Sequence, residues 1–238
     1  MHNRSPLIAT RVRGAPHPPG RRLAALAAAA LLAVAGTTAA ALAQQPRAKS
    51  VRAPGCTLKR AKTLKANREV RVFRTVPAVG SGTVYGCRRR AARAYVLGEF
   101  GECQNNHEIR RVEVAGRRAA LGAFECSLDS GAWDVELVNL ATGRLEFRAA
   151  PFASPLPDSA TFDELQRVVA TSDGALAWTA IRSARGGRLA IEVRRRMRGS
   201  ATASLLLDYG TNIDPDSLRK RGRTLSWTKL GVTRTAGF

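Results

Sequence analysis

Residues 133–147 read WDVELVNLATGRLEF. Apolar and polar side chains alternate from Trp133 to Val138, which is typical of a β-strand that buries one face. Residues 139–144 carry Asn, Thr and Gly, and Gly143 can supply the positive φ angle that a tight turn needs. Alternation resumes at Leu145. This stretch therefore predicts a β-hairpin.

Similar alternation recurs along the chain and predicts an all-β fold. The clearest segments are residues 69–74 and 109–114, and residues 165–170, 175–181, 188–194 and 203–207 are also predicted to be strands. One pattern repeats: a strand ends near a glycine, and a strand with a large apolar residue follows. The clearest copies surround Gly116, Gly174 and Gly222, which are 58 and 48 residues apart. These spacings are close to the periods of propeller blades.

In residues 139–144 and 173–178 the chain resembles β-propeller repeats, loosely those of the TolB-like or quinoprotein-like kind. It is also similar to secreted proteins of Gly/Arg-rich composition that have no assigned activity. The resemblance covers residues 69–238 and implies a propeller-like array of three to four antiparallel blades. The roughly fourteen strands that we expect would form about three and a half blades, and closure at four would require an N-terminal strand. A β-sandwich is the alternative.

The N-terminal residues have the order of a secretory signal. Arg21 and Arg22 precede an Ala-rich apolar run, which ends at Ala41-Leu42-Ala43. A positive region, an apolar region and a small-residue cleavage site predict a signal peptide at residues 1–43. Residues 44–55 then form a flexible basic lead-in, and residues 56–238 form a single β-rich domain. We expect a secreted or extracytoplasmic protein. The alternative is membrane anchoring by residues 21–43, whose length is close to that of a membrane span.

Four cysteines follow the leader: Cys56, Cys87, Cys103 and Cys126. An even number of cysteines in an exported chain favours disulfides. Three pairings are possible, and we expect Cys56–Cys87 and Cys103–Cys126 because each joins neighbouring segments. No C-x-x-C spacing is present and the mature chain has a single histidine, so we expect no metal site and no cofactor.

Basic residues dominate the composition, with 39 Lys and Arg against 18 Asp and Glu. The leader contains five arginines and no acid, so its removal lowers the formal net charge from +21 to about +16. Guanidinium groups bind phosphate and carboxylate well. The candidate polyanion-binding residues are Arg88, Arg89, Arg90, Arg194, Arg195, Arg196 and Arg198. The alternative is that these arginines solvate exposed strand faces.

Catalytic motifs are absent from the sequence. His107 has no G-x-S-x-G serine to activate, and the acids Asp163, Glu164, Asp214 and Asp216 lie where a helix start and a turn are expected. We therefore expect no enzyme, but an exported structural or interaction module at the cell surface whose partner is a protein or an anionic polymer. One alternative is an arginine-rich module that binds a cell-wall polymer or anionic lipid. Another is a hydrolase or lyase on a propeller-like scaffold. Nucleic acid is not an expected partner because few aromatic residues interleave with the arginines.

Overall fold

The computed structural model describes residues 56–75, 82–100, 107–126, 131–152, 163–183, 189–200 and 204–238. These residues form fifteen β-strands without a helix, which confirms the all-β prediction. Accordingly, no helix in the described ranges could cross a membrane. The predicted leader (residues 1–43) and lead-in (residues 44–55) lie outside the described residues and stay predictions.

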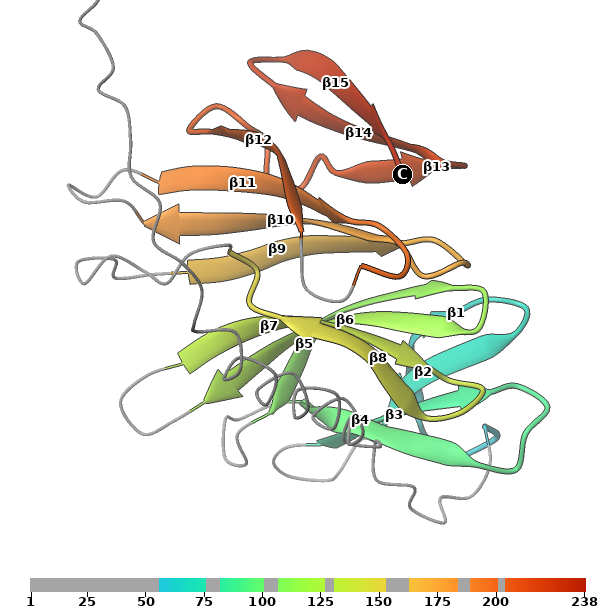
Figure 1. The fold of residues 1–238 in the computed structure, drawn as a ribbon. Coiled ribbons are helices and arrows are strands. Elements are labelled where there is room, and N and C mark those ends of the chain that lie inside the picture. Colours follow the sequence, from blue (N-terminus) through green and yellow to red (C-terminus); the bar gives the residue numbers. More distant parts are fainter. Residues whose placement is uncertain are drawn as a thin grey trace, which may run out of the picture. The chain divides into compact units, whose positions relative to one another are not determined.

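The first eight strands follow one another in a single antiparallel sheet, apart from one short parallel contact (Figure 1). The strands are β1 (Lys62–Ala66), β2 (Val70–Arg74), β3 (Gly82–Arg88), β4 (Ala94–Phe100), β5 (Glu108–Ala115), β6 (Arg118–Cys126), β7 (Gly131–Asn139) and β8 (Arg144–Ala149). β4 and β5 are joined by a single residue pair, Glu99 with Glu108. The sheet is therefore two four-stranded meanders joined at one point.

Two smaller sheets follow, each again a meander. The four-stranded sheet contains β9 (Asp163–Ala170), β10 (Leu176–Ser183), β11 (Leu189–Arg196) and β12 (Leu205–Gly210). The three-stranded sheet contains β13 (Arg219–Arg221), β14 (Thr224–Lys229) and β15 (Val232–Gly237). The hairpin predicted at residues 133–147 is confirmed as β7 and β8, and Gly143 has a φ of 70°.

Three apolar cores lie between successive meanders. Val72 and Leu97 pack with Leu121 between the first two meanders, and Leu137 packs with Trp178 between the next two. The last core joins β9–β12 to β13–β15 and is built around residues such as Trp227. The first strands of consecutive meanders (β1, β5, β9 and β13) also contact one another in turn. The meanders therefore stack on one another in chain order.

β6 is buried on both faces because it lies between two of these cores. Ala119 and Leu121 face one core, while Ala120 faces the other. Small residues allow the close approach: a Cβ added at Gly122 would lie 2.5 Å from Leu165 Cδ2 and 2.9 Å from Arg111 Cβ. The alternation seen in half-buried strands is lost here because both faces are covered.

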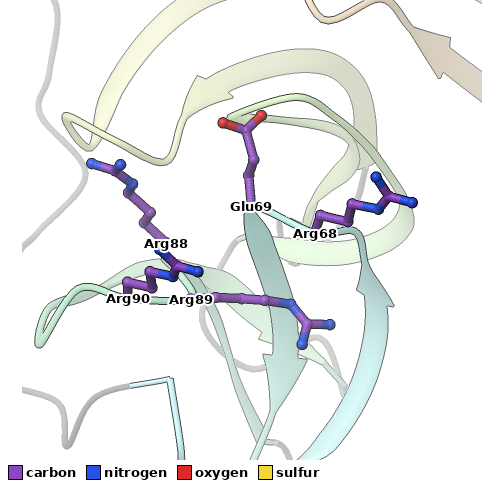
Figure 2. A pocket seen from close by; sticks show the side chains of 5 residues that line it. All are labelled: Arg68, Glu69, Arg88, Arg89 and Arg90. Carbon is purple, nitrogen blue, oxygen red and sulfur yellow. The ribbon is translucent and has the colours of Figure 1, made fainter.

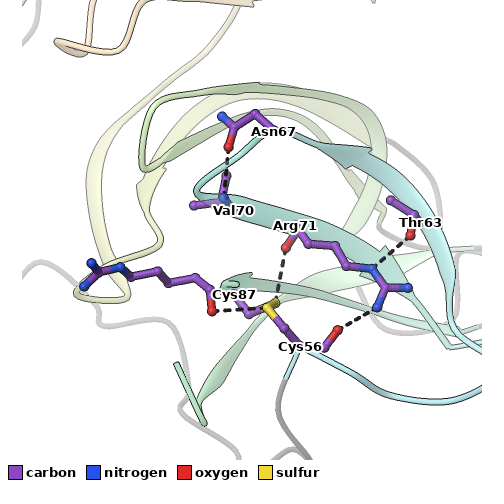
Figure 3. Close-up of a disulfide and its surroundings, with 7 residues drawn as sticks. Cys56, Thr63, Asn67, Val70, Arg71 and Cys87 are labelled. Carbon is purple, nitrogen blue, oxygen red and sulfur yellow. Dashed lines mark hydrogen bonds between the residues drawn. A yellow bond between two sulfur atoms is a disulfide. The ribbon is translucent and has the colours of Figure 1, made fainter. Parts of the chain in front are cut away.

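A disulfide links Cys56 to Cys87, in agreement with the predicted pairing, with 5.8 Å between the Cα atoms. Arg71 holds the same segment: its guanidinium donates hydrogen bonds to Cys56 O (2.6 Å) and Thr63 Oγ1 (2.9 Å) (Figure 3). It also donates to Ala61 O (3.1 Å). Cys126 is also disulfide-bonded. The predicted Cys103–Cys126 bridge stays a prediction, because Cys103 lies outside the described residues.

Candidate anion-binding site

The turns that follow the odd-numbered strands lie beside one another at one end of the stacked meanders. Asn67 Nδ2 in the β1–β2 turn donates to Gly116 O in the β5–β6 turn (2.9 Å). Arg117 O, also in the β5–β6 turn, accepts a hydrogen bond from Leu140 N (2.8 Å). We call this end the basic end. It consists of the turns that follow β1, β3, β5, β7, β9, β11 and β13, with their flanking strand residues.

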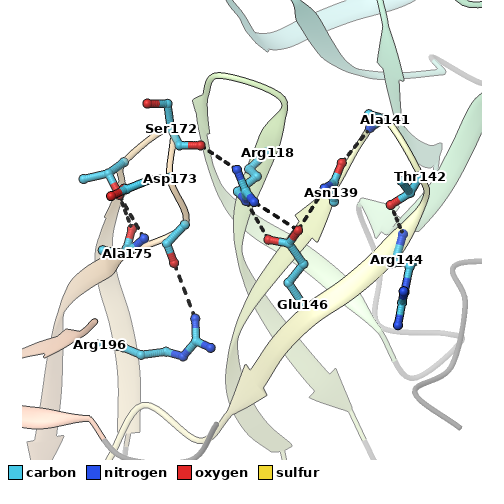
Figure 4. A network of polar contacts seen from close by, with 12 residues as sticks. Arg118, Asn139, Ala141, Thr142, Arg144, Glu146, Ser172, Asp173, Ala175 and Arg196 are labelled. Carbon is cyan, nitrogen blue, oxygen red and sulfur yellow. Dashed lines mark hydrogen bonds and ion pairs between the residues drawn. The ribbon is translucent and has the colours of Figure 1, made fainter. Parts of the chain in front are cut away.

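The later meanders join the basic end through side chains. Arg118 Nη1 donates to Ser172 O in the β9–β10 turn (2.5 Å), and Arg223 lies 3.8 Å from Asp173 (Nη1 to Oδ2). Figure 4 shows the centre of this network. Arg118 forms a bidentate pair with Glu146 (2.6 and 3.2 Å), and Asn139 Nδ2 donates to the same carboxylate (2.8 Å). These contacts hold the turns of neighbouring meanders in register.

Ten exposed arginines gather at the basic end. They are Arg68, Arg88, Arg89, Arg90, Arg93, Arg117, Arg144, Arg198, Arg221 and Arg223. In its described residues the end has three acids, Glu69, Glu146 and Asp173, and each has an arginine partner. The excess of positive charge is therefore not neutralised within the domain. Of the predicted candidates, Arg88, Arg89, Arg90 and Arg198 belong to this surface.

A hollow of about 260 Å³ lies within the basic end and is lined by Arg68, Glu69, Arg88, Arg89 and Arg90 (Figure 2). Arg88 ends β3, Arg89 and Arg90 follow it in the turn, and Arg68 comes from the β1–β2 turn. Arg89 N donates to Glu69 O (2.9 Å), which joins the two turns directly. Arginines that are distant in sequence therefore face one cavity.

The β1–β2 turn is held by the side chain of Asn67. Its Oδ1 accepts hydrogen bonds from Glu69 N (2.8 Å) and Val70 N (2.9 Å). An Asn side chain that bonds the backbone two and three residues on stabilises a tight turn. Arg68 is therefore held at the tip of the turn. Arg117 pairs with Glu69 (Nε to Oε1, 2.9 Å), so the one acid of the hollow brings another guanidinium beside it.

The arrangement suits the capture of anions. Guanidinium groups offer forked donors that match the paired oxygens of phosphate and carboxylate. Several exposed arginines around one cavity also repel one another, and an anion between them relieves that repulsion. The hollow can therefore take one anionic group while neighbouring arginines contact further groups.

The predicted cluster at Arg194, Arg195 and Arg196 is mostly used inside the domain. Arg194 is buried and pairs with Glu192 (2.8 Å). Arg196 is also buried, 4.2 Å from the centre of the Phe147 ring, and burial lowers the pKa of its guanidinium. Arg195 donates to Gly237 O. Successive strand residues point to opposite faces, so three consecutive arginines in β11 do not share a surface.

His107 lies at the opposite end from these turns, in a charged cluster that the sequence did not reveal. Its Nε2 is 3.6 Å from Glu136 Oε2, and its Nδ1 is 3.9 Å from Glu125 Oε1. Arg148 contacts Glu125, Glu136 (3.4 Å) and Asp134 (2.6 Å). Burial raises the pKa of Asp134, the neighbouring Glu136 raises it further and His107 opposes the rise. The members come from β6, β7, β8 and the residue before β5, so no sequence spacing could indicate the cluster.

The other acids considered from the sequence are occupied by structural contacts. Asp163 and Glu164 begin β9, with Arg182 (3.7 Å) and Arg111 (3.1 Å) as their respective partners. Asp214 lies in a turn, as predicted, and its Oδ1 accepts from Asp216 N (3.0 Å). Within the described ranges, no three His, Cys, Asp or Glu side chains are arranged to hold a metal ion.

Comparison with known proteins adds no family to this picture, since no protein-family model and no curated protein matches the chain.

Proposed function

We propose that the chain is an exported, non-catalytic β-module that binds a polyanion through its basic end. The observation that carries the proposal is the gathering of ten exposed arginines on one end of the stacked meanders, against three acids that are already paired. The Cys56–Cys87 disulfide favours an oxidising compartment, as the predicted leader does.

The ligand that fits best is a linear polymer of repeated anionic groups at the cell surface. The arginines are distributed over turns from all four meanders, so a chain of charges can contact more of them than a single small anion can. Release of condensed counterions from such a polymer would drive binding. An anionic lipid surface offers the same headgroup chemistry and is the second source of ligand.

The stacked meanders support a propeller-like architecture, with β1–β4, β5–β8 and β9–β12 as blades and β13–β15 as an incomplete fourth. Contacts between the first strands of successive meanders agree with this proposal, as do the apolar cores between them. In a propeller the turns at one end of every blade share a surface, which is where such proteins commonly bind ligands. The basic end is that surface here.

Binding to heparin, used as a model polyanion, at a series of salt concentrations tests the proposal. The triple variant Arg88→Gln, Arg89→Gln, Arg90→Gln removes three charges from the hollow. The matched control Lys59→Gln, Arg60→Gln, Lys62→Gln removes the same charge from exposed residues before and at the start of β1, which do not line the hollow. Each lost ionic contact should reduce the slope of log affinity against log salt by about 1.

For the triple variant at Arg88, Arg89 and Arg90, we expect the slope of log affinity against log salt to fall by about two to three. Its affinity near physiological salt should fall roughly 10-fold or more, because each exposed ion pair contributes up to about 1 kcal/mol. The control should retain most of its affinity. Equal losses in the two variants would mean that binding follows net charge alone. Unchanged binding in both would mean that the polyanion binds elsewhere than the hollow, and no binding of heparin by the wild type would leave an interaction module that does not recognise anions. Vesicles with and without anionic lipid separate the two ligand sources.

A further inference from the structure

The C-terminal sheet has three strands where the preceding meanders each have four. β15 pairs with β14 on one side, and no strand of the described residues pairs with its other side, which we call the open edge (Figure 1). An open edge presents unpaired N–H and C=O groups, to which an extended segment can bind as a further strand. We propose that the open edge of β15 binds an extended acidic segment of a partner protein. This site is separate from the basic end and does not depend on it.

The turn between β14 and β15 decides which backbone groups face the open edge. Leu230 and Gly231 both have positive φ angles (52° and 74°), as a two-residue type I′ turn requires. Lys229 and Val232 then form the hydrogen-bonded pair that closes the hairpin. Because bonded and non-bonded pairs alternate along an antiparallel ladder, the N–H and C=O of Thr233 and Thr235 point outward.

No described residue bonds to these outward groups of Thr233 and Thr235. Farther along, Gly237 O accepts from Arg195, so the available edge ends there. The strand is accessible: Val232 is 57% exposed and Leu230 in the turn is 70% exposed. No proline interrupts β15, and its one charged residue, Arg234, lies on the face toward β12.

Charge favours an acidic occupant. The sequence from Arg219 to Phe238 contains six basic residues and no acid: Arg219, Lys220, Arg221, Arg223, Lys229 and Arg234. Trp227 is opposite Arg234 in the ladder, and both line a hollow of about 430 Å³ beside β12. The acid in that hollow, Asp208, already accepts from Lys229 Nζ (2.6 Å) and Trp227 Nε1 (2.8 Å). No described carboxylate pairs with Arg234, so an added strand can supply one.

Two other occupants agree less well with these charges. A second copy that paired β15 with β15 would bring two basic, acid-free sheets together. The chain's own residues 44–55 contain Arg47, Lys49 and Arg52, with no acid and with prolines at positions 46 and 54. Each proline lacks the N–H that a strand donates. Both alternatives can be recognised in the experiment below.

The probe is a short synthetic peptide that alternates valine with glutamate, titrated into the full chain by fluorescence anisotropy. Thr233→Pro removes an outward N–H and leaves the bonds to β14 in place, and Thr233→Val is the matched control that keeps the backbone donor. We expect roughly 10-fold or more weaker binding for Thr233→Pro and less than about 3-fold change for Thr233→Val. A peptide with lysine in place of glutamate should not bind.

Amide hydrogen exchange on the same samples locates the peptide. The amides of Thr233 and Thr235 should exchange quickly in the free chain and slowly once the peptide is bound, while core amides in β10 confirm that Thr233→Pro is folded. Equal binding by the proline and valine variants would overturn the proposal. Protection of Thr233 and Thr235 before peptide is added would overturn it too, because a second copy or the chain's own residues would already cover the edge. The variant with Arg88, Arg89 and Arg90 replaced by glutamine should bind the peptide normally, whatever its affinity for heparin.

Discussion

Asp163 offers a direct test of the packing between β9 and its neighbours through the pH dependence of stability. Its carboxylate begins β9 and lies 3.7 Å from Arg182 Nε. Burial raises the pKa of Asp163 from 3.8 to about 6, although Arg182 lowers it, and Glu192 adds to the rise. Desolvation therefore outweighs the attraction of the nearby guanidinium.

The size of the effect follows from the two pKa values. The interval from 3.8 to about 6 corresponds to at most about 3 kcal/mol, at about 1.4 kcal/mol for each tenfold change, and solvent screening of this partly exposed carboxyl reduces that energy. Below 3.8 the carboxyl is protonated in both the folded and the unfolded chain, so it causes no penalty. As the pH rises to about 6 the unfolded chain ionises first, and the folded state loses stability progressively. Above about 6 the loss is complete.

The variant Asp163→Asn removes this titration and preserves the size of the side chain. Urea unfolding of both proteins between about pH 4 and about pH 8 gives the free energy of unfolding at each pH. Relative to the wild type, the variant should gain up to about 2.5 kcal/mol between the ends of this range, because the unfolded wild type is already partly ionised at about pH 4 and other titrating groups are shared and cancel. Parallel profiles, within about 0.5 kcal/mol, would show that burial does not raise the pKa of Asp163 and that β9 packs more loosely than described.

Two further predictions concern the packing of the domain. Gly122→Ala should lower the free energy of unfolding by about 1–3 kcal/mol because its Cβ meets Leu165. The control Gly237→Ala, where nothing lies within 4 Å of the added Cβ, should change the free energy of unfolding by less than about 0.5 kcal/mol. Similar effects of the two variants in urea titrations would contradict the close approach of β6 and β9. Replacing both Cys56 and Cys87 by alanine opens a loop with a sequence separation of 31, and should cost about 3–4 kcal/mol in the chain-entropy model. Reduction of this bridge in the wild type should lower the free energy of unfolding by the same amount. An unchanged urea midpoint in the double variant would argue against the pairing.

Short-range patterns were sufficient to predict many of the strands and one disulfide. The alternation from Trp133 to Val138 and the glycine at 143 determine a hairpin locally, and the structure contains it as β7 and β8. Cys56 and Cys87 lie in neighbouring segments, which made their pairing the simplest choice. Signals of this kind depend on a few adjacent residues and do not require knowledge of the packing.

The site depended on information that the sequence does not contain. Arg88–Arg90 and Arg194–Arg196 look alike as runs of arginine, yet the first run leaves its strand for an exposed turn and the second stays in a strand covered on both faces. Strand boundaries, which sequence patterns locate least well, therefore decide which run meets solvent. The approach of Arg68 to Arg89 depends in addition on the pairing of β2 with β3.

The location of the exposed charge follows from the way the meanders stack. Strands between two cores, such as β6, have no face open to water, so an arginine within them needs an internal partner, as Arg194 has in Glu192. Turns have no such restriction, and arginines there keep their hydration. Stacking therefore confines unpaired charge to the ends of the meanders and to the sheet that has no neighbour beyond it. The basic end and the β13–β15 sheet both meet this condition and carry an excess of arginine and lysine, which is why an anionic ligand is proposed for each.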